Sequence, residues 1–353
     1  MSTKIEWTGE TWNPVTGCNK VSSGCKNCYA EKMHKRLQGI KPEKYAHDFL
    51  EGAFPYQPDL LLPFKWKKPR MVFLNSMSDL FHRNIPFDFI DKVFAIMGLT
   101  RQHTYQILTK RPERMLEYFS VENDFDLYDR WNDAAIDLLT EFNHDWHGDF
   151  NTISLPNVWL GTSVENQKTA DERIPFLIQV PAAVRFLSCE PLLGSIDLQK
   201  IFNLKSDRLN SELDSLRGIN RVTDIHFEET TEHLIRRLHW IIAGGESGHG
   251  ARPMHPEWVR SLRDQSQAVG VAFFFKQWGE WFPASQDWKL KVHEYHSKAI
   301  AEDGGAWNTA WDLETWGARN FSNNFKLGKK RSGRLLDGRE WNEFPKVREE
   351  VQA

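Results

Sequence analysis

The sequence predicts an α/β fold in which six parallel strands form a TIM-like barrel. Three observations predict it: short runs rich in Val, Ile and Phe, segments with helical spacing between those runs, and polar residues where each run ends. Strands that are buried on both faces read as continuous apolar runs, and their alternation with helices is typical of a parallel sheet. At 353 residues the chain is long enough for one large α/β domain or two smaller ones.

The elements alternate along the chain. Phe87, Ile90 and Phe94 fall on one helical face and predict the first helix. A second helix begins at Pro112, a residue suited to the first helical turn. The first helix is expected over 85–99, and two more helices are expected over 166–180 and 255–270. The six strands are expected at 71–79, 104–111, 158–165, 184–192, 239–247 and 271–279.

Polar residues at the strand ends favour a barrel over a doubly wound sheet, although the alternation fits both. Chemistry drawn from the carboxyl ends of many strands is typical of barrels. At any single position a helix cap or a turn residue is the alternative. The strand-end residues are Asn75, Ser76, Ser78, Asp79, Thr109, Lys110, Arg111, Thr162, Ser163, Glu165, Ser188, Cys189, Glu190, Glu246, Ser247, Lys276 and Gln277.

Two segments interrupt this pattern. Residues 116–154 read as an acidic, aromatic helical insertion, and residues 199–238 read as a charged insertion without strand character. Beyond residue 283 the chain is polar, with scattered Trp and Gly. We therefore expect a barrel domain over 1–283 that contains both insertions, and a C-terminal extension over 284–353 that packs on the barrel and takes part in substrate binding.

The net charge of −3 and the pI near 6.5 exclude a purely electrostatic attraction to nucleic acid over the whole surface, but they leave room for a local basic groove. No apolar run approaches the roughly 20 residues of a membrane span. The N-terminus "MSTKIEWTGE" lacks the basic and apolar regions of a signal peptide. The sequence therefore predicts a cytoplasmic protein without a membrane partner.

Three of the four cysteines, Cys18, Cys25 and Cys28, lie in the stretch "TGCNKVSSGCKNCYAEK" with the spacing C-x6-C-x2-C. In a reducing compartment such a cluster is more typical of metal binding or chemistry than of disulfides. Structural zinc normally takes four protein ligands, and His34, the nearest candidate, is in a stretch that reads as helix. Three thiolates on a cubane iron–sulfur cluster leave one iron open to a small molecule. Cys189 is in a predicted strand, where we expect a core or pocket-wall residue.

The stretches "WTGETWNPVTGC", "GCKNCYAE" and "GRLLDGREWNEFP" carry a resemblance. The chain resembles the radical S-adenosylmethionine enzymes and, more closely and over most of its length, a phage-associated three-Cys-motif family of uncertain function. The first gap is three residues longer than in the common C-x3-C-x2-C pattern, which puts the loop geometry in doubt. The second gap and the aromatic residue after the third cysteine, Tyr29, are kept.

This resemblance implies a partial (β/α)6 barrel with a [4Fe-4S] cluster on Cys18, Cys25 and Cys28. It also implies S-adenosylmethionine on the open iron, with reduction cleaving it to methionine and a 5′-deoxyadenosyl radical, and an electron donor such as flavodoxin or ferredoxin. The wider superfamily includes spore photoproduct lyase, a DNA repair enzyme, so a nucleic-acid substrate is expected by analogy.

The resemblance also distributes roles among the strand-end residues. Ser76, Ser78 and Asp79 are expected near the amino group of S-adenosylmethionine, and Lys110 or Arg111 near its carboxylate. The alternatives are a helix cap for Asp79 and a rim salt bridge for the basic pair. The remaining cofactor candidates are Tyr29, Ser163 and Glu165, the latter two for ribose hydroxyls, and Glu190 and Glu246 for adenosine or substrate.

Two further segments are candidates for substrate binding. The Gly-rich stretch "ESGHGARPMH" reads as a mobile loop at the mouth of the barrel and holds His249, Arg252 and His255. The basic run that contains Lys329, Lys330 and Arg331 lies near four aromatic residues, a combination typical of nucleic-acid binding. A solvated tail is the alternative. The aromatic residues are Trp307, Trp311, Trp316 and Phe321.

The sequence thus predicts a radical S-adenosylmethionine enzyme that acts on DNA, RNA or a nucleotide, in repair or modification. A different class of protein is the main alternative, namely a non-catalytic zinc-bound module that binds nucleic acid or a partner. A third interpretation is an iron–sulfur protein that only carries electrons.

Overall fold

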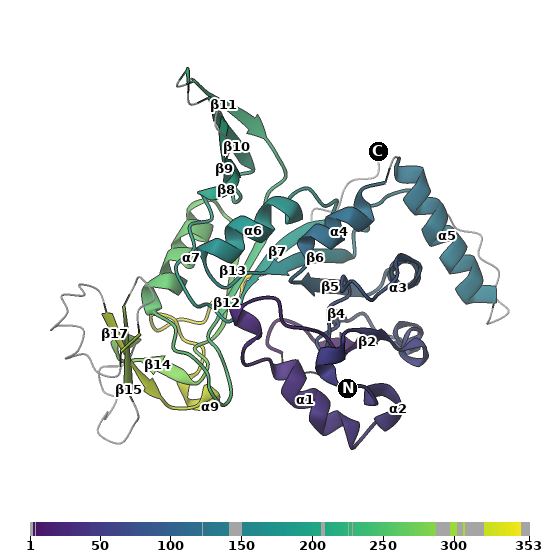
Figure 1. Cartoon of the computed structure of the whole chain (residues 1–353), viewed down its shortest axis with the longest axis horizontal. Coiled ribbons are helices and arrows are strands. Elements are labelled where there is room, and N and C mark those ends of the chain that lie inside the picture. Colours follow the sequence, from purple (N-terminus) through teal and green to yellow (C-terminus); the bar gives the residue numbers. More distant parts are fainter. Residues whose placement is uncertain are drawn as a thin grey trace.

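The computed structural model describes residues 3, 5–121, 123–140, 150–205, 209–224, 226–227, 229–286, 297–301, 306–307 and 321–346. It confirms the α/β class: parallel strands form a curled half-barrel flanked by helices (Figure 1). The strand order is β1-β4-β5-β6-β7-β12-β13. These strands are β1 (Glu10–Trp12), β4 (Met71–Leu74), β5 (Thr104–Thr109), β6 (Val158–Ser163), β7 (Val184–Cys189), β12 (Trp240–Gly244) and β13 (Ala272–Gln277).

Six of these strands fall within the predicted ranges, and β1 was not predicted. It has only three residues, too few to produce an apolar run, but it pairs in parallel with β4 over its whole length. The chain leaves β1 directly into a small pair of strands, β2 (Val15–Thr16) and β3 (Phe54–Pro55). β1 therefore places the cysteine segment at the carboxyl edge of the half-barrel.

Helices cover the outer face of the half-barrel. The outward side chains of the strands, such as Val72 and Ile107, share one core with apolar residues of the helices, such as Ile90, Ile174 and Val259. Two further helices, α1 and α2, follow the cysteines. The helices are α1 (Tyr29–Gln38), α2 (Pro42–Tyr45), α3 (Phe87–Leu99), α4 (Pro112–Phe119), α6 (Gln167–Leu177) and α7 (Pro256–Ala268). In the described part of the chain, none of the helices has the length and apolar character needed to cross a membrane.

The inner face of the half-barrel has an aromatic floor and a polar layer. Because side chains alternate between the faces of a strand, Phe73, Trp159, Phe186, Trp240 and Phe274 all point inward. Trp159 and Trp240 are in edge contact, with ring centroids 5.8 Å apart. Nearer the carboxyl ends of the strands, the same alternation turns polar residues inward. This polar layer contains Lys110, Ser163, Ser188, Glu190 and Lys276.

The insertion over 199–238 corrects the prediction that it lacks strands. It forms an antiparallel sheet of order β11-β10-β9-β8 that projects from the body (Figure 1). None of the residues of β10 or β11 is buried, so these strands have no apolar alternation to detect. Cross-strand pairs such as Arg221 with Glu232, at 2.9 Å, add to the backbone ladder. The strands are β8 (Ile201–Lys205), β9 (Leu209–Asp214), β10 (Ile219–Asp224) and β11 (Glu229–Leu234).

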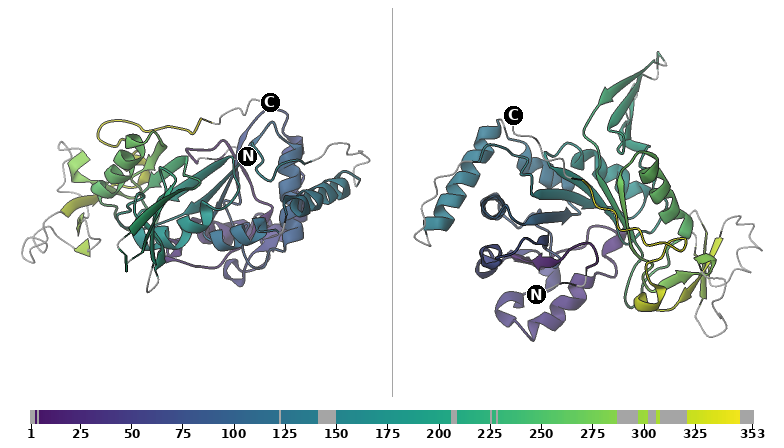
Figure 2. Two further views of the ribbon diagram at one scale, coloured as in Figure 1. Left: turned by 90° about the horizontal axis from the view of Figure 1, so that it is seen from above. Right: turned by 180° about the vertical axis from the view of Figure 1, so that it is seen from behind.

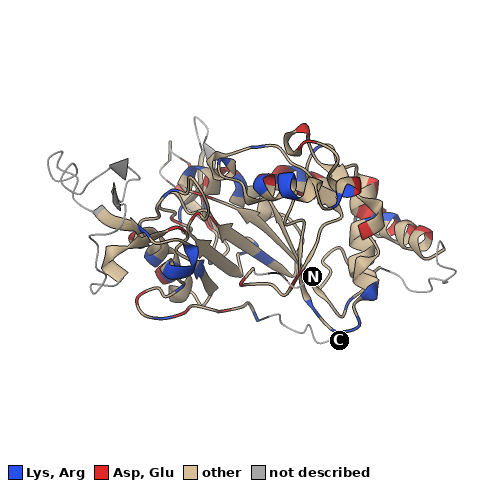
Figure 3. Ribbon diagram, turned by 90° about the horizontal axis from the view of Figure 1, so that it is seen from below, with Lys and Arg blue, Asp and Glu red and all other residues tan. Residues whose placement is uncertain are grey.

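The insertion over 116–154 contains the predicted helix, α5 (Asp124–Thr140), and residues 141–149 lie outside the described residues. Trp131 of α5 stacks on Phe94 of α3, with ring centroids 5.1 Å apart. Arg130 also pairs with the largely buried Asp91 at 2.8 Å. Asp residues recur along α5, which lies at one end of the molecule (Figure 3). This helix is thus fixed to the barrel by aromatic packing and one ion pair.

The C-terminal extension begins with a second antiparallel sheet, of order β14-β17-β15-β16, and the short helix α9 (Lys329–Ser332). The segment 333–346 then returns to the edge of the half-barrel (Figure 2). Phe275 N–H of β13 donates to Trp341 O at 2.9 Å, which covers part of an exposed sheet edge. Trp311 and Trp316 lie outside the described residues. The strands of the second sheet are β14 (Trp281–Pro283), β15 (Ser297–Ala301), β16 (Ala306–Trp307) and β17 (Phe321–Lys326).

The aromatic floor leads to a first prediction. A Cβ on Gly161 would lie 2.7 Å from ring atoms of Phe186, so Gly161→Ala should displace that ring and destabilise the fold by about 1–3 kcal/mol. Urea-induced unfolding measures this loss. Gly39→Ala is the matched control, because the nearest atom to a Cβ at position 39 would be Arg36 O, at 3.8 Å. Equal unfolding free energies for the two variants would contradict the packing described here.

Candidate functional site

The cysteine loop, defined as residues 17–28, lies at the carboxyl edge of the half-barrel. Gly17 forms a parallel bridge with Ser78, just beyond β4, and the Ser78 hydroxyl donates to Gly17 O at 2.5 Å. Cys18 N–H donates to Phe49 O at 2.8 Å, which fixes the start of the loop. Cys25 ends a short 3-10 turn, and Cys28 is the N-cap residue of α1. The three thiols are therefore presented from three different local structures.

Each thiol of the loop is partly buried and has a partner of its own. Cys18 donates to Asn19 O at 3.4 Å, and Cys25 Sγ is 3.9 Å from Ser22 Oγ. Cys28 interacts with backbone N–H groups in the first turn of α1. Cys25 lies near enough to influence both other thiols electrostatically. Within the described ranges, no three His, Cys, Asp or Glu side chains are grouped so that they could hold a metal ion.

Burial keeps two of these thiols protonated. It raises the pKa of Cys18 to about 11, with Asp79 adding to the rise and Arg111 opposing it. Burial also raises the pKa of Cys28, although hydrogen bonds from the backbone N–H groups of Glu31 and Ala30 lower it in part. Since a metal binds the thiolate form, metal binding here has to release protons.

Arg111 is a cation in contact with the first thiol of the loop. Its Nη1 lies 3.7 Å from Cys18 Sγ and 2.8 Å from Asp79 Oδ2, and its Nη2 donates to Asn19 Oδ1 at 2.6 Å. The Asp79 carboxylate also accepts from Thr109 Oγ1 at 2.7 Å and from Lys110 N–H at 3.0 Å. Asp79 was predicted to meet a cofactor amino group. In the structure its carboxylate holds Arg111 beside Cys18.

Glu165 is fully buried and joins the cysteine loop to two strands. It accepts from Ser22 Oγ of the loop at 2.7 Å and from Lys110 Nζ at 2.7 Å, and Arg173 of α6 lies 3.3 Å away. Lys110 also donates to Ser163 Oγ at 2.7 Å. Burial alone would raise the pKa of Glu165, but Lys110 and Arg173 outweigh it, so the pKa is below its ordinary value. Glu165, predicted to bind ribose hydroxyls, therefore acts here as an internal anion.

Gly24 lets the cysteine loop pack directly on this carboxylate. A Cβ at position 24 would lie 2.3 Å from Glu165 Oε1 and 2.6 Å from its Cγ. No larger residue fits unless the loop or the glutamate moves. The contact explains why a glycine stands between Ser22 and Cys25.

A second carboxylate holds the other end of the loop. Glu246, just beyond β12, accepts from Asn27 Nδ2 at 3.0 Å and pairs with Arg252 at 2.6 Å. Arg252 also donates to Ser23 O at 3.0 Å. Burial would raise the pKa of Glu246, but the bonds from Arg252 and Asn27 lower it. The Gly-rich segment 246–252, predicted to be mobile, is thus fastened to the cysteine loop.

Glu190 belongs to a separate cluster of the polar layer. Lys276 Nζ donates to it at 2.8 Å, and Gln277 Nε2 donates to it at 3.1 Å. Lys276 was absent from the predicted site residues, although its place at the end of a predicted strand was a usable signal. Arg173 and Asn27 were also missed, because they lie on a helix and in a loop where no pattern distinguishes them.

Several predicted residues lie in other environments. Cys189 is fully buried in β7, where burial raises its pKa, and belongs to the core. His255 is buried as the N-cap of α7, where its Nδ1 accepts from Glu257 N–H at 3.2 Å. His34 is buried as well, with Nε2 2.8 Å from His47 O. Cys189 therefore lies in the core and His255 at a helix cap, and the substrate roles stay predictions.

The remaining candidates are at the surface or in local turns. Ser76 Oγ donates to Asn13 Oδ1 at 3.1 Å. Tyr29 is 64% exposed beside Cys28. His249 is exposed and offers its carbonyl to Lys32 Nζ at 3.1 Å. The three basic residues of α9 are exposed, with Lys329 3.2 Å from Glu6; the other two are Lys330 and Arg331.

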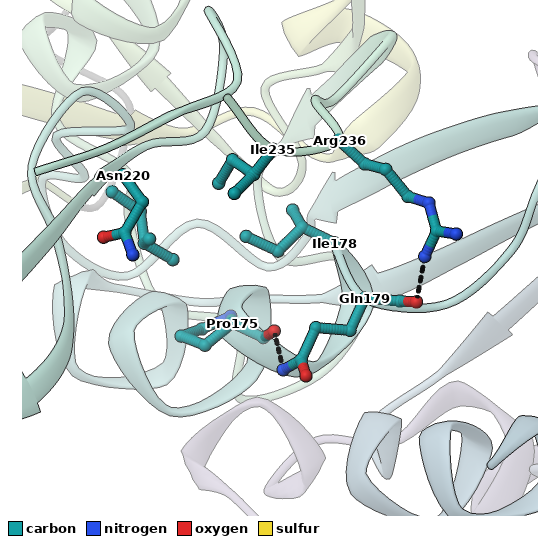
Figure 4. Close-up of a pocket in the computed structure, with 7 residues that line it drawn as sticks. Pro175, Ile178, Gln179, Asn220, Ile235 and Arg236 are labelled. Atoms are coloured by element: carbon teal, nitrogen blue, oxygen red, sulfur yellow. Dashed lines mark hydrogen bonds between the residues drawn. The ribbon is translucent and has the colours of Figure 1, made fainter. Parts of the chain in front are cut away.

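A hollow of about 410 Å³ lies between the end of α6 and the inserted sheet (Figure 4). Its wall is partly apolar, and Arg236 donates to Gln179 O at its rim. None of its lining residues belongs to the cysteine loop or to the polar layer. The lining residues are Pro175, Ile178, Gln179, Leu213, Asn220, Ile235 and Arg236.

Comparison with known proteins gives one match. A family model described as a protein of unknown function (DUF5131) matches residues 2–345. No curated protein and no solved structure matches the chain.

The contacts of Glu165 lead to a second prediction. Glu165→Gln removes the charge that Lys110 and Arg173 pair with, and Gly24→Ala forces the loop off the carboxylate. A charge-assisted bond contributes roughly 1.5–3 kcal/mol, so each variant should raise the iodoacetamide alkylation rate of the loop thiols about 10-fold or more. Asp91→Asn is the control, because Asp91 is also a buried, paired carboxylate, and its partners Arg130 and Tyr118 belong to α5 and α4 rather than to the loop. Unchanged rates in both loop variants would show that Glu165 does not hold the loop.

Proposed function

Because the chain belongs to the DUF5131 family of proteins of unknown function, we propose its activity from its own site: a radical S-adenosylmethionine enzyme that acts on a nucleic acid. In this proposal Cys18, Cys25 and Cys28 bind a [4Fe-4S] cluster. S-adenosylmethionine is the second cofactor, and a protein such as flavodoxin or ferredoxin supplies the electron.

One observation carries the proposal. The three-cysteine loop lies at the carboxyl edge of a parallel half-barrel, where a residue two to four positions beyond the end of each of β4, β5, β6 and β12 contacts it. Reactive groups of barrel enzymes come from the ends of several strands at this edge. A structural metal clip needs no such convergence. The arrangement therefore supports a reaction centre at the loop.

Three cysteines are a donor set of the kind that holds an iron–sulfur cluster. Cys25 influences both other thiols electrostatically, and Arg111 provides positive charge beside Cys18, where a thiolate would otherwise be unfavourable. In the described structure His34 Nε2 donates to the His47 carbonyl within an aromatic cluster, which argues against His34 as the fourth ligand of a zinc site. The thiols have to leave their present partners to bind the cluster.

The protein's own groups define what surrounds that centre. When bound, a cluster with one iron free of protein ligands supplies the electron that cleaves S-adenosylmethionine. Arg111 and Lys110 place positive charge on one side of the loop, where a carboxylate can be held. Glu190 and Lys276, about 20% and 14% exposed in their side chains, offer an acceptor and a donor from the polar layer. The aromatic floor closes the inner face below them and excludes water.

Metal and product analysis test the proposal. Anaerobically purified protein should contain about four irons per chain with matching sulfide, and dithionite with S-adenosylmethionine should give 5′-deoxyadenosine, which chromatography detects. A colourless protein with one zinc would favour a zinc-bound binding module. Iron and sulfide without 5′-deoxyadenosine would favour an electron carrier.

Single cysteine variants test the ligand assignment. Cys25→Ala should abolish iron binding, because it removes one of three thiolates. Cys189→Ala, in the core, should keep its iron and lose only about 1–2 kcal/mol of stability. Iron content per folded chain measures both. Equal loss of iron in the two variants would exclude the three-ligand assignment.

A further inference from the structure

Positive charge is dense in two short segments that lie far apart in the chain. Residues 17–47 contain seven Lys or Arg and two Glu, and residues 326–334 contain five Lys or Arg without an acidic residue. The whole chain has 45 basic and 48 acidic residues, so the rest is strongly acidic. Basic segments in a chain of net negative charge are typical of local anion binding.

The fold brings these distant segments together through the Gly-rich segment 246–252. Lys32 Nζ of α1 donates to His249 O at 3.1 Å, and Asn27 Nδ2 of the cysteine loop donates to Gly250 O at 2.8 Å. Gly248 N–H donates to the Glu280 carboxylate at 2.9 Å. Gly328 N–H, at the start of α9, donates to Glu280 O at 3.1 Å. The segment therefore connects α1 with α9, and both helices lie in the lower part of the view in Figure 1.

The outward side of α1 is basic and aromatic. Ala30 and His34 are buried, which turns Tyr29, Lys32, Lys35 and Arg36 toward solvent. In the part of the chain that the structure describes, no carboxylate pairs with Lys35 or Arg36, and the same holds for the exposed Lys26 of the loop. Their charges are free to meet an anion.

We propose that the cysteine loop, α1 and α9 form one basic surface that binds the backbone of single-stranded nucleic acid and leads it past the cysteines. The inference deepens the proposed function, on which its substrate class rests. The cations of this surface are spread over several elements. Phosphates that repeat along a nucleic-acid strand can contact such spread cations, whereas a ligand with a single cluster of carboxylates can contact only a few of them. Tyr29, exposed among Lys26, Lys32 and Arg36, provides a face on which a base can stack.

Salt-dependent binding of a fluorescent oligothymidylate to the full-length protein tests the surface. Two triple variants remove three charges each: Lys26→Gln with Lys35→Gln and Arg36→Gln, and Lys329→Gln with Lys330→Gln and Arg331→Gln. Lys32 is kept because it bonds to the His249 carbonyl. Each triple variant should weaken binding and lower the slope of log K against log salt by about 2, since a single-stranded contact contributes roughly 0.7 per phosphate.

The control removes three exposed lysines from the opposite edge of the sheet. Lys65, Lys67 and Lys68 precede β4, whereas the cysteine loop lies beyond its carboxyl end. Their replacement by Gln should leave the affinity and the salt slope unchanged, and thermal unfolding confirms that all variants are folded. Equal loss in the control, or unchanged binding in the α1 triple variant, would overturn the proposal.

Two further outcomes are decisive. Failure of the unaltered protein to bind the oligonucleotide overturns the proposal. The proposal is also overturned if the protein instead binds flavodoxin and the α1 variant weakens that binding, because the partner of the surface is then an acidic protein. The binding measurement needs neither iron nor S-adenosylmethionine, so it is independent of 5′-deoxyadenosine formation. Oligonucleotide binding without 5′-deoxyadenosine would therefore count against the proposed enzyme activity, and 5′-deoxyadenosine without oligonucleotide binding would count against the basic surface.

Discussion

The buried carboxylate of Glu165 is the contact on which the candidate site depends. A carboxylate without solvent exposure has to be paired, and Lys110, Arg173 and Ser22 pair it from β5, α6 and the cysteine loop. The loop can approach this anion only because residue 24 is a glycine. One electrostatic requirement thus connects three elements that are far apart in the chain, and the position of the thiols follows from it.

A second carboxylate completes this support without duplicating it. Glu246 reaches the far end of the loop through Asn27 and Arg252, while Asp79 directs Arg111 toward Cys18. Three acidic residues therefore act on the loop from three strand ends. The charges of the polar layer are balanced within the protein, whereas Lys35 and Arg36 on the outer side of α1 pair with no carboxylate in the described part of the chain.

Much of the fold could be predicted from the sequence, because buried parallel strands leave runs such as "VWLG" and "HWIIAGG" that no other structure explains as well. β1 and the sheet β8 to β11 could not, since one is too short and the other too exposed to form an apolar pattern. The sequence located the polar residues that follow the strands, but it did not show which of these residues pair with one another. Glu165 and Lys110 pair across adjacent strands, and spacing along the chain carries no information on such pairs.

The support of the cysteine loop also fixes the order in which the site can form during synthesis. Residues 17–28 leave the ribosome early, but Glu165, Arg173, Glu246 and Arg252 follow much later. Domains fold as units once enough of the chain has emerged. The loop therefore waits, with its thiols unsupported, until about two thirds of the polypeptide exists. The thiols therefore reach their supported positions late in synthesis.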